Sequence, residues 1–328
     1  MTTKIVGSGL ICLDIIYEKN KLENAIYTIG GSCGNVISTL SYLDCNTYPI
    51  IIHKRNDVTY KLIEEEIHKL KINYDLIIED DNYRIPIIIQ ENFKQNHKFK
   101  FKNPLKNEYL PKYKSLNDKA IDEIKNSKII PDFFYFDRCN LSNLELVKFY
   151  KEKGTIVFFE PSKISNEKVF KECLKYSDIV KYSQDRLDNI DKYIIDKIIP
   201  VEIKTLGNKG LKFRINNHSW IEQKAKKVTN VIDSSGCGDI CSTGLLYYLK
   251  DNKLLSEENI NRGLKIGQTM AAINCSFMGA KTFVDYIRKN DFLQLVHDSL
   301  DKESINFDNK YNSSEKSKIK IEEFFLEL

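Results

Sequence analysis

The stretch Asp233-Ser234-Ser235-Gly236-Cys237-Gly238-Asp239 stands directly before a strongly helical segment. Its glycines and small polar residues predict a turn whose backbone N–H groups, at residues 236–238, point toward an anion. Asp239 falls in the first turn of the helix, where a carboxylate can act as a base toward a hydroxyl group. Phosphoryl transfer needs both parts, because its catalysis is mainly positioning and charge stabilisation. The same stretch also fits an ordinary glycine-rich turn with an aspartate at a helix start.

Strand and helix patterns alternate along the chain from about residue 115 onward. Strand-like runs rich in β-branched and aromatic residues stand at 133–136, 155–159, 179–182, 198–204 and 211–215. Helix-like patterns occupy residues 144–153, 167–174, 239–250 and 261–275. Strands that alternate with helices indicate right-handed βαβ units and a mostly parallel sheet.

The first hundred residues begin with a predicted buried strand and turn over residues 4–14. Gly7 and Gly9 are spaced as in a dinucleotide-binding fingerprint, but Cys12 holds the third glycine position and no helix pattern follows, which excludes that site. Helix patterns cover residues 35–43 and 59–70. Residues 85–90 and the alternating Lys-Phe run 98–102 predict a half-exposed pair of strands.

Composition limits the class of protein. The 328 residues, 42% hydrophobic and 29% charged, can form one large domain, with or without a small appendage. A net charge of +4 with interspersed acidic and basic residues does not favour a nucleic-acid-binding protein. The eight cysteines form no Cys-x-x-Cys pair, so we expect reduced thiols. Without a signal-peptide pattern or an apolar run of about 18 residues, the sequence predicts a cytoplasmic protein with no membrane partner.

In their order along the chain, the motifs resemble the ribokinase family of carbohydrate kinases, also called the PfkB family. The family signature Asp-Thr-Thr-Gly-Ala-Gly-Asp stands here as residues 233–239, with Ser for Thr and Cys for Ala. A double glycine and an Asn that opens a helix stand as Gly30-Gly31-Ser32-Cys33-Gly34-Asn35. Further similar elements are the strand leading to an Asp at 7–14, a nucleotide-side loop at 205–210 and Gly279-Ala280. The resemblance covers residues 4 to 290.

The resemblance implies an α/β fold: a ribokinase-like three-layer sandwich with a mostly parallel central sheet and a small β-sheet lid. The kinase domain would span residues 1–300, with half-exposed lid strands near 15–29 and 84–102, and a polar C-terminal tail would follow over 301–328. Such a lid excludes water from the acceptor. Since the lid often serves as a dimer surface in the family, a homodimer through the lid is also an expectation.

The resemblance further implies roles for individual residues. Asp239 is expected to be the catalytic base, and the anion hole would consist of Gly236, Cys237 and Gly238. The acceptor hydroxyls would be held by Asp14, Gly30, Gly31 and Asn35. Contacts to the nucleotide are expected from Thr205, Gly207, Gly210, Ser183 and Gln268.

Each role has an ordinary alternative. Asp14 also fits a turn after a strand, Asn35 fits a helix N-cap, and residues 205–210 fit a plain loop.

Gly238→Val would be expected to damage both the anion hole and the local backbone.

One family motif is altered. The Asn-x-x-Glu segment that organises Mg²⁺ and phosphates has its counterpart in Ser183-Gln184-Asp185-Arg186, without a Glu at the expected place. The family's Asp-Pro-Asn appears as Glu160-Pro161-Ser162. The resemblance thus implies ATP and Mg²⁺, but the protein ligands of the metal stay unassigned, since ATP phosphates and water can hold Mg²⁺. It also leaves room for a monovalent cation.

These expectations describe an ATP-dependent kinase, a phosphotransferase with an alcohol group as acceptor, that acts on a sugar or sugar-like molecule. A nucleoside kinase of the same family is the first alternative, with Tyr17, Tyr27, Phe99 and Phe101 as candidates for stacking on a base. The second is a non-catalytic binding or regulatory protein, because a fold does not fix a function. The intact Asp239 favours a catalytic protein, whereas the missing Glu in segment 183–186 favours a non-catalytic one.

Overall fold

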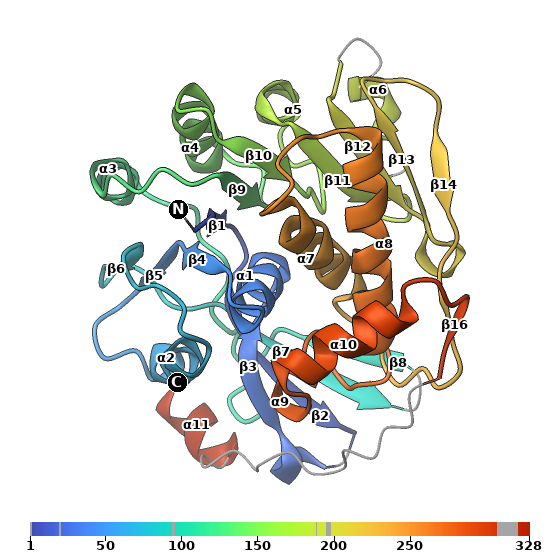
Figure 1. Cartoon of the computed structure of the whole chain (residues 1–328). Coiled ribbons are helices and arrows are strands. Elements are labelled where there is room, and N and C mark those ends of the chain that lie inside the picture. The colour runs from blue at the N-terminus through green and yellow to red at the C-terminus, as the bar shows by residue number, and fades with distance from the viewer. Residues whose placement is uncertain (1, 20, 94–95, 188, 195–197, 307–320) are drawn as a thin grey trace.

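A computed structural model describes residues 2–19, 21–93, 96–187, 189–194, 198–306 and 321–328 (Figure 1). Its main sheet has the strand order β14-β13-β12-β11-β10-β9-β1-β4. The strands from β4 across to β12 run parallel, and β13 and β14 extend one edge in antiparallel fashion. The bounds are β1 Lys4–Ser8, β4 Asn46–Pro49, β9 Phe133–Phe136, β10 Ile156–Phe159, β11 Ile179–Ser183, β12 Val201–Thr205, β13 Leu211–Ile215 and β14 Ile221–Gln223.

Helices cover both faces of this sheet, because its strands are apolar on both sides. In β9, Phe133 and Tyr135 belong to one core cluster, and Phe134 and Phe136 belong to the other. Helices of the first cluster are α1 Ser32–Tyr42, α2 Val58–Leu70, α7 Cys237–Leu249, α8 Glu257–Asn274, α9 Phe283–Tyr286 and α10 Lys289–Ser299. Helices of the second are α3 Asp118–Asn126, α4 Leu141–Glu152, α5 Glu167–Tyr176 and α6 Asp191–Ile194. The three-layer sandwich with a mostly parallel sheet is therefore confirmed (Figure 1).

A smaller sheet with the order β3-β2-β7-β8 stands beside the main one, as expected for the lid sheet. Its strands are β2 Cys12–Glu18, β3 Ile26–Gly30, β7 Ile87–Phe93 and β8 Asn96–Lys100. The expected half-exposure is wrong for β2, which is buried except at Glu18. β2 is buried because it lies between β3 and β7 in the sheet. The chain after α8 also covers it: Gly279 packs against Ile16 so closely that a Cβ at Gly279 would lie 2.6 Å from Ile16 Cδ1.

The remaining strands form two short parallel pairs. β5 Ile51–His53 pairs with β6 Ile77–Glu79, and β15 Lys227–Val228 pairs with β16 Ser304–Ile305. The second pair ties the start of the expected C-terminal tail to the domain. The proposed boundary at residue 300 stays a prediction, and residues 307–320 lie outside the described part of the chain.

The last helix, α11 Ile321–Glu327, docks on the lid sheet. The side chains of Phe324 and Phe325 are buried, and the ring of Phe324 packs edge-on against Tyr27 with 5.7 Å between centroids. In the described residues, no helix is both long and apolar enough to cross a membrane.

We predict that Phe324→Ala lowers the free energy of unfolding by about 3–5 kcal/mol, because it removes a buried ring and leaves a cavity. Leu326→Ala on the same helix is the matched control: Leu326 is 64% exposed, and a change there should stay within about 0.5 kcal/mol. Denaturant unfolding of both variants measures the difference. Equal effects of the two substitutions would show that α11 does not contribute to the fold as described.

Candidate active site

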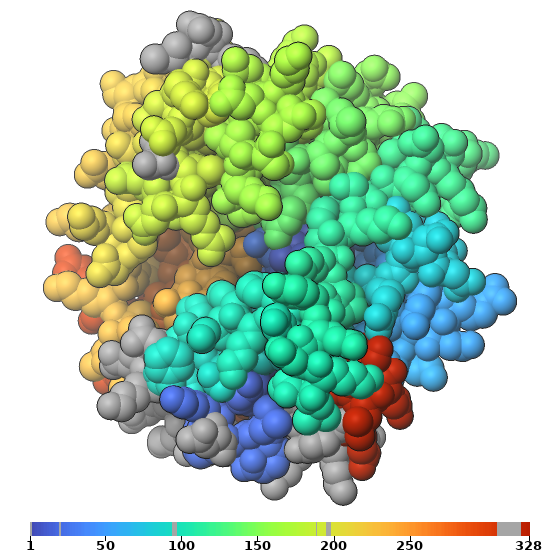
Figure 2. All heavy atoms as spheres, turned by 180° about the vertical axis from the view of Figure 1, so that it is seen from behind, coloured from blue at the N-terminus to red at the C-terminus, as the bar shows by residue number. Residues whose placement is uncertain are grey.

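Polar residues gather where the parallel strands end at their carboxyl edge, the usual ligand position in open α/β sheets. Asp137 follows β9, Glu160 follows β10, and Ser183 and Thr205 end the neighbouring strands β11 and β12. In the space-filling view a hollow opens between the lid segment (teal) and the yellow-green ends of the sheet (Figure 2). The amino end of α7 belongs to the same region, since Lys181 of β11 bonds to the Gly238 carbonyl.

Asp239 lies in the first turn of α7, where it is partly exposed. Asn35 Nδ2 donates a hydrogen bond of 2.8 Å to Asp239 Oδ2. Loss of solvation in the cleft raises the pKa of Asp239 to about 6, and the negative charge of Glu160 adds to the shift, whereas the Asn35 bond and Lys181 oppose it. A carboxylate with such a pKa is a stronger base than an ordinary aspartate.

Asn35 lies inside α1, whose N-cap is Gly31 at φ 77°, so the N-cap alternative for Asn35 is wrong. The Asn35 side chain is 4% exposed, and its Oδ1 atom has no hydrogen-bond partner among the described residues. A buried acceptor without a donor is costly, by roughly 1–3 kcal/mol. The Asn35 carboxamide therefore holds Asp239 with one atom and presents the other as an acceptor for a hydroxyl group.

Asp14 lies on β2, opposite Thr28 on β3. Gly30 makes room for it, because a Cβ at Gly30 would lie 2.0 Å from the Asp14 carboxylate. Burial raises the pKa of Asp14 to about 6, and the negative charge of Asp239 increases the shift. The shift is opposed by the thiol of Cys12, the ammonium of Lys281 and the N–H of Gly31. The structure thus brings Asp14, Asn35 and Asp239 into one site.

Lys181 and Glu160 form a buried ion pair that sequence reasoning missed. Lys181 Nζ contacts Glu160 Oε1 and donates a 3.0 Å hydrogen bond to the Gly238 carbonyl. Glu160 also accepts bonds from Ser242 and from Tyr135 OH, the latter at 3.0 Å. Burial lowers the pKa of Lys181, but the charge and hydrogen bond of Glu160, together with Cys241 and Asp239, outweigh it, so the pKa is raised and the ammonium stays charged. The signal in the sequence was a lysine inside the apolar strand, since a buried lysine needs a partner.

Asp137 is a second missed residue, and it explains Gly9, the second glycine of the pair near the N-terminus. It accepts a 2.8 Å hydrogen bond from the N–H of Leu10, and Arg138 Nη1 lies 3.0 Å from its other oxygen. A Cβ at Gly9, where φ is +146°, would fall 1.7 Å from Asp137 Oδ1. Burial raises the pKa of Asp137 to about 6, with Arg138 opposing the shift. Gly9 therefore serves a close side-chain approach rather than a dinucleotide.

The turn before α7 is where an anion hole is predicted, and we call residues 233–238 the anion-hole turn. Gly236 is left-handed at φ 68°, and a Cβ there would lie 2.3 Å from Ala280 Cβ, so this position requires glycine. The N–H groups of the first helical turn have no partner within the helix and can bind an anion, although the Cys237 N–H makes a 3.4 Å hydrogen bond to the Ser234 carbonyl before the helix. The expectation that a side chain at position 238 would damage the local backbone is wrong. The φ of Gly238 is not positive, and an added Cβ would make only ordinary contacts of 3.7 and 3.8 Å with Lys181 and Glu160.

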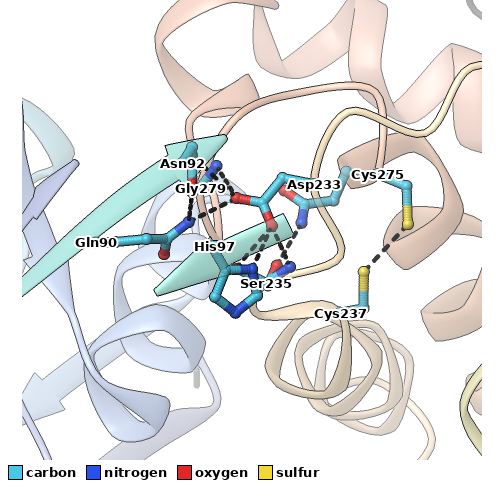
Figure 3. Close-up of polar contacts among 9 residues, drawn as sticks. Gln90, Asn92, His97, Asp233, Ser235, Cys237, Cys275 and Gly279 are labelled. Carbon is cyan, nitrogen blue, oxygen red and sulfur yellow. Dashed lines mark hydrogen bonds and ion pairs between the residues drawn. The ribbon is translucent and has the colours of Figure 1, made fainter. Parts of the chain in front are cut away.

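Asp233, at the start of the signature, ties the lid to this turn (Figure 3). Its Oδ2 accepts hydrogen bonds from Gln90 Nε2 of β7 at 2.6 Å and from the N–H of Gly279 at 2.9 Å. Its Oδ1 accepts bonds from the N–H and hydroxyl of Ser235 at 2.9 and 2.8 Å, and His97 Nδ1 of β8 lies 3.3 Å away. Asp233 is thus a structural residue that links two lid strands to the anion-hole turn.

The residues predicted to contact the nucleotide fall into two groups. Ser183 and Thr205 are register neighbours at the ends of β11 and β12. Gly210 (φ +103°) packs against β14, where an added Cβ would lie 2.1 Å from the Gln223 carbonyl oxygen, and Gln268 donates a 2.8 Å bond to the side chain of the same Gln223. Gly207, at φ +60°, lies between β12 and β13 in the short helix η2 Gly207–Lys209. Their role in nucleotide binding stays a prediction.

A protein-built metal site does not fit this edge of the sheet. Asp185 and Arg186 are exposed in the turn after β11, and Glu160 is engaged by Lys181. Throughout the part of the chain that the structure describes, no group of three or more acidic, His or Cys side chains is placed to hold a metal ion. Magnesium would therefore have to arrive with nucleotide phosphates and its own water ligands.

No family model matches the chain, and a comparison with curated protein sequences found no match. Among solved structures, ribokinase from Arabidopsis thaliana complexed with ribose and ATP has a TM-score of 0.68 at 16% identity, covering 90% of this chain and 99% of that one. Fructokinase with bound ATP from Xylella fastidiosa has a TM-score of 0.72 at 14% identity, covering 91% and 99%. Aminoimidazole riboside kinase from Salmonella enterica, complexed with aminoimidazole riboside and an ATP analogue, has a TM-score of 0.68 at 17% identity, covering 89% and 99%. The chain therefore has the ribokinase-like fold of these sugar and nucleoside kinases.

Proposed function

We propose that this protein is an ATP-dependent kinase that phosphorylates a hydroxyl group of a sugar or sugar-like small molecule. The observation that carries the proposal is the Asn35–Asp239 hydrogen bond at the amino end of α7, with Asn35 Oδ1 left without a donor. This arrangement joins a base, a hydroxyl acceptor and a helix terminus suited to phosphate. The structural neighbours, which are described with ribose and ATP, with bound ATP, and with aminoimidazole riboside and an ATP analogue, support the same reaction class.

The chain's own residues suggest how the transfer would proceed. The acceptor hydroxyls bind to Asn35 Oδ1 and to the carboxylate of Asp14. Asp239 takes the proton of the attacking hydroxyl as that oxygen bonds to the γ-phosphorus, and the bond to ADP breaks. The N–H groups of residues 236–238 stabilise the negative charge on the transferred group. Lys181 holds the Gly238 carbonyl and thereby the peptide plane that leads into Asp239.

The lid residues bear on the nucleoside alternative. Tyr17 is buried, and Tyr27 packs on Phe324 of α11, so both rings are already engaged. Phe99 and Phe101 are 44% and 50% exposed, and Phe99 packs on His97. These contacts favour a sugar-like acceptor, and the riboside kinase among the neighbours keeps a nucleoside as the second candidate.

The non-catalytic alternative is tested first. Purified protein is incubated with ATP and a panel of sugars and nucleosides, while calorimetry measures nucleotide binding. We expect ATP consumption with at least one member of the panel. Nucleotide binding without phosphoryl transfer to any member would instead favour a binding or regulatory protein.

Asp239→Asn should lower turnover by about 10²–10⁴, because an amide cannot accept the proton. Affinity for ATP should change little, since the N–H groups of the turn remain in place. Asp251→Asn, in the exposed turn just after the carboxyl end of the same helix, is the control and should keep wild-type turnover. Near-normal turnover in Asp239→Asn would refute the proposed mechanism.

The pH dependence of kcat/KM follows from the raised pKa of Asp239. Because the carboxylate is the active form and its pKa is about 6, kcat/KM should rise with pH up to about 6 and level off above it. Below that pH it should fall about tenfold per pH unit. The carboxyl of Asp14, which would bind the acceptor and whose pKa is also raised to about 6, contributes in the same pH range. An Asp14→Asn variant should therefore have a lower kcat/KM, but kcat/KM should still fall with decreasing pH because Asp239 remains. If kcat/KM instead began to fall only near pH 4, the pKa of Asp239 would not be raised as described.

Lys181→Met should lower both stability and turnover. It leaves the carboxylate of Glu160 buried without its partner, which typically costs about 3–5 kcal/mol, and it releases the Gly238 carbonyl. The double variant Lys181→Met/Glu160→Gln removes the unpaired charge, so it should regain stability but not turnover. Unfolding and kinetic measurements on both variants separate the two effects, and full recovery of turnover in the double variant would contradict the positioning role.

A further inference from the structure

Two thiols meet beside the anion-hole turn (Figure 3). Cys237 is the first residue of α7, and Cys275 directly follows α8. Their sulfur atoms lie 3.2 Å apart, both residues are partly exposed, and both are free thiols. A disulfide bond is about 2.05 Å long, so the two sulfurs need to approach by only roughly 1 Å to form one.

The backbone holds the two segments in this arrangement. The carbonyl of Cys275 accepts hydrogen bonds from the N–H groups of Ile232 at 2.7 Å and Asp233 at 3.2 Å. Asn274 Nδ2 donates a 3.1 Å bond to the carbonyl of Ser235. The packing of the turn against the end of α8 therefore holds the backbones of the two cysteines near each other.

The two thiols differ in reactivity. The hydrogen bond between the two thiols lowers the pKa of Cys275, although burial opposes the shift. The same hydrogen bond, together with burial, raises the pKa of Cys237. Since the thiolate is the nucleophile in thiol–disulfide exchange, Cys275 reacts first and Cys237 is placed to resolve the product.

We propose that Cys237 and Cys275 form a reversible disulfide that disables the anion-hole turn; its effect on turnover rests on the proposed kinase function. The oxidant is a low-molecular-weight disulfide such as glutathione disulfide. The Cys275 thiolate attacks one of its sulfurs, forms a mixed disulfide and releases one thiolate. Cys237, after losing its proton, then attacks the Cys275 sulfur and releases the second. Two protein thiols are oxidised to one disulfide, and one small disulfide is reduced to two thiols.

The bond acts on the site through the backbone of Cys237. Its N–H group belongs to the turn that would receive the phosphoryl group, and Gly236 before it is already packed against Ala280. Drawing the Cys237 sulfur toward α8 shifts the first turn of α7, and displacements of about 1 Å at a reacting site can cost up to about 10²-fold in rate. The oxidised protein is therefore the inactive form.

A second neighbouring thiol pair provides a matched control. Cys139 and Cys173 also share a hydrogen bond, which lowers the pKa of Cys139. Cys139 lies in the segment after β9 and is partly exposed, while Cys173 is buried in α5. A Cys139→Ser variant removes this pair and leaves the anion-hole turn untouched.

The experiment treats the full-length wild-type protein with glutathione disulfide and then with dithiothreitol. Mass spectrometry of proteolytic peptides identifies the cross-link, calorimetry measures affinity for the non-hydrolysable analogue AMP-PNP, and turnover is measured with an acceptor from the panel. We expect a Cys237–Cys275 cross-link, at least tenfold loss of AMP-PNP affinity or turnover, and recovery after reduction. Cys275→Ser should keep wild-type turnover and resist the oxidant, whereas Cys139→Ser should behave as the wild type does.

Three results would overturn the proposal: no Cys237–Cys275 cross-link, a cross-link with unchanged AMP-PNP affinity and turnover, or inhibition that persists in Cys275→Ser. The cross-link and the AMP-PNP affinity do not require phosphoryl transfer. If both respond to oxidation while no acceptor is phosphorylated, the disulfide stands and the proposed kinase function fails. If phosphorylation occurs but no cross-link forms, the kinase function stands and the disulfide fails.

Discussion

The start of α7 is the constraint on which the site depends. The helix must begin at the carboxyl edge of the sheet, directly beneath the lid, and its first residues must remain accessible. Gly236 makes this possible, because only a residue without a Cβ can take its left-handed conformation while lying against Ala280. From that single turn follow the accessible N–H groups, the position of Asp239 and the nearness of Cys237 to Cys275.

Charge balance is the second organising feature. Asp14, Asp137 and Asp239 have pKa values raised to about 6, because each carboxyl has lost solvation at the same end of the sheet. Lys181 and Lys281 are paired with Glu160 and Glu66, and Arg138 is paired with Asp137, so the carboxyls of Asp14 and Asp239 have no ion-pair partner of their own among the described residues. Such an arrangement suits a site that binds hydroxyl groups and removes a proton.

The lid and the anion-hole turn are built as one unit. Gln90 and His97 from the lid strands reach Asp233, and the chain after α8 supplies the N–H of Gly279 to the same carboxylate. The side of the site that would bind the acceptor is therefore fixed to the side that would stabilise the phosphoryl group. A ligand that moves the lid would act on both, because the buried carboxylate cannot lose its donors without cost.

The sequence by itself indicated the α/β class and the positions of the main strands and helices, since hydrophobic periodicity and glycine-rich turns are local signals. The glycine-rich turn before a helix also made Asp239 a candidate base, whereas Asp14 and Asn35 became candidates only through the resemblance of the ordered motifs to the ribokinase family. It could not reveal the partners of Lys181, Asp137 or Cys275. These residues meet Glu160, Leu10 and Cys237 from distant parts of the chain, and no local pattern encodes such contacts. Only the tertiary structure decided them, because burial, pKa shifts and thiol proximity arise from packing between elements rather than from any one segment.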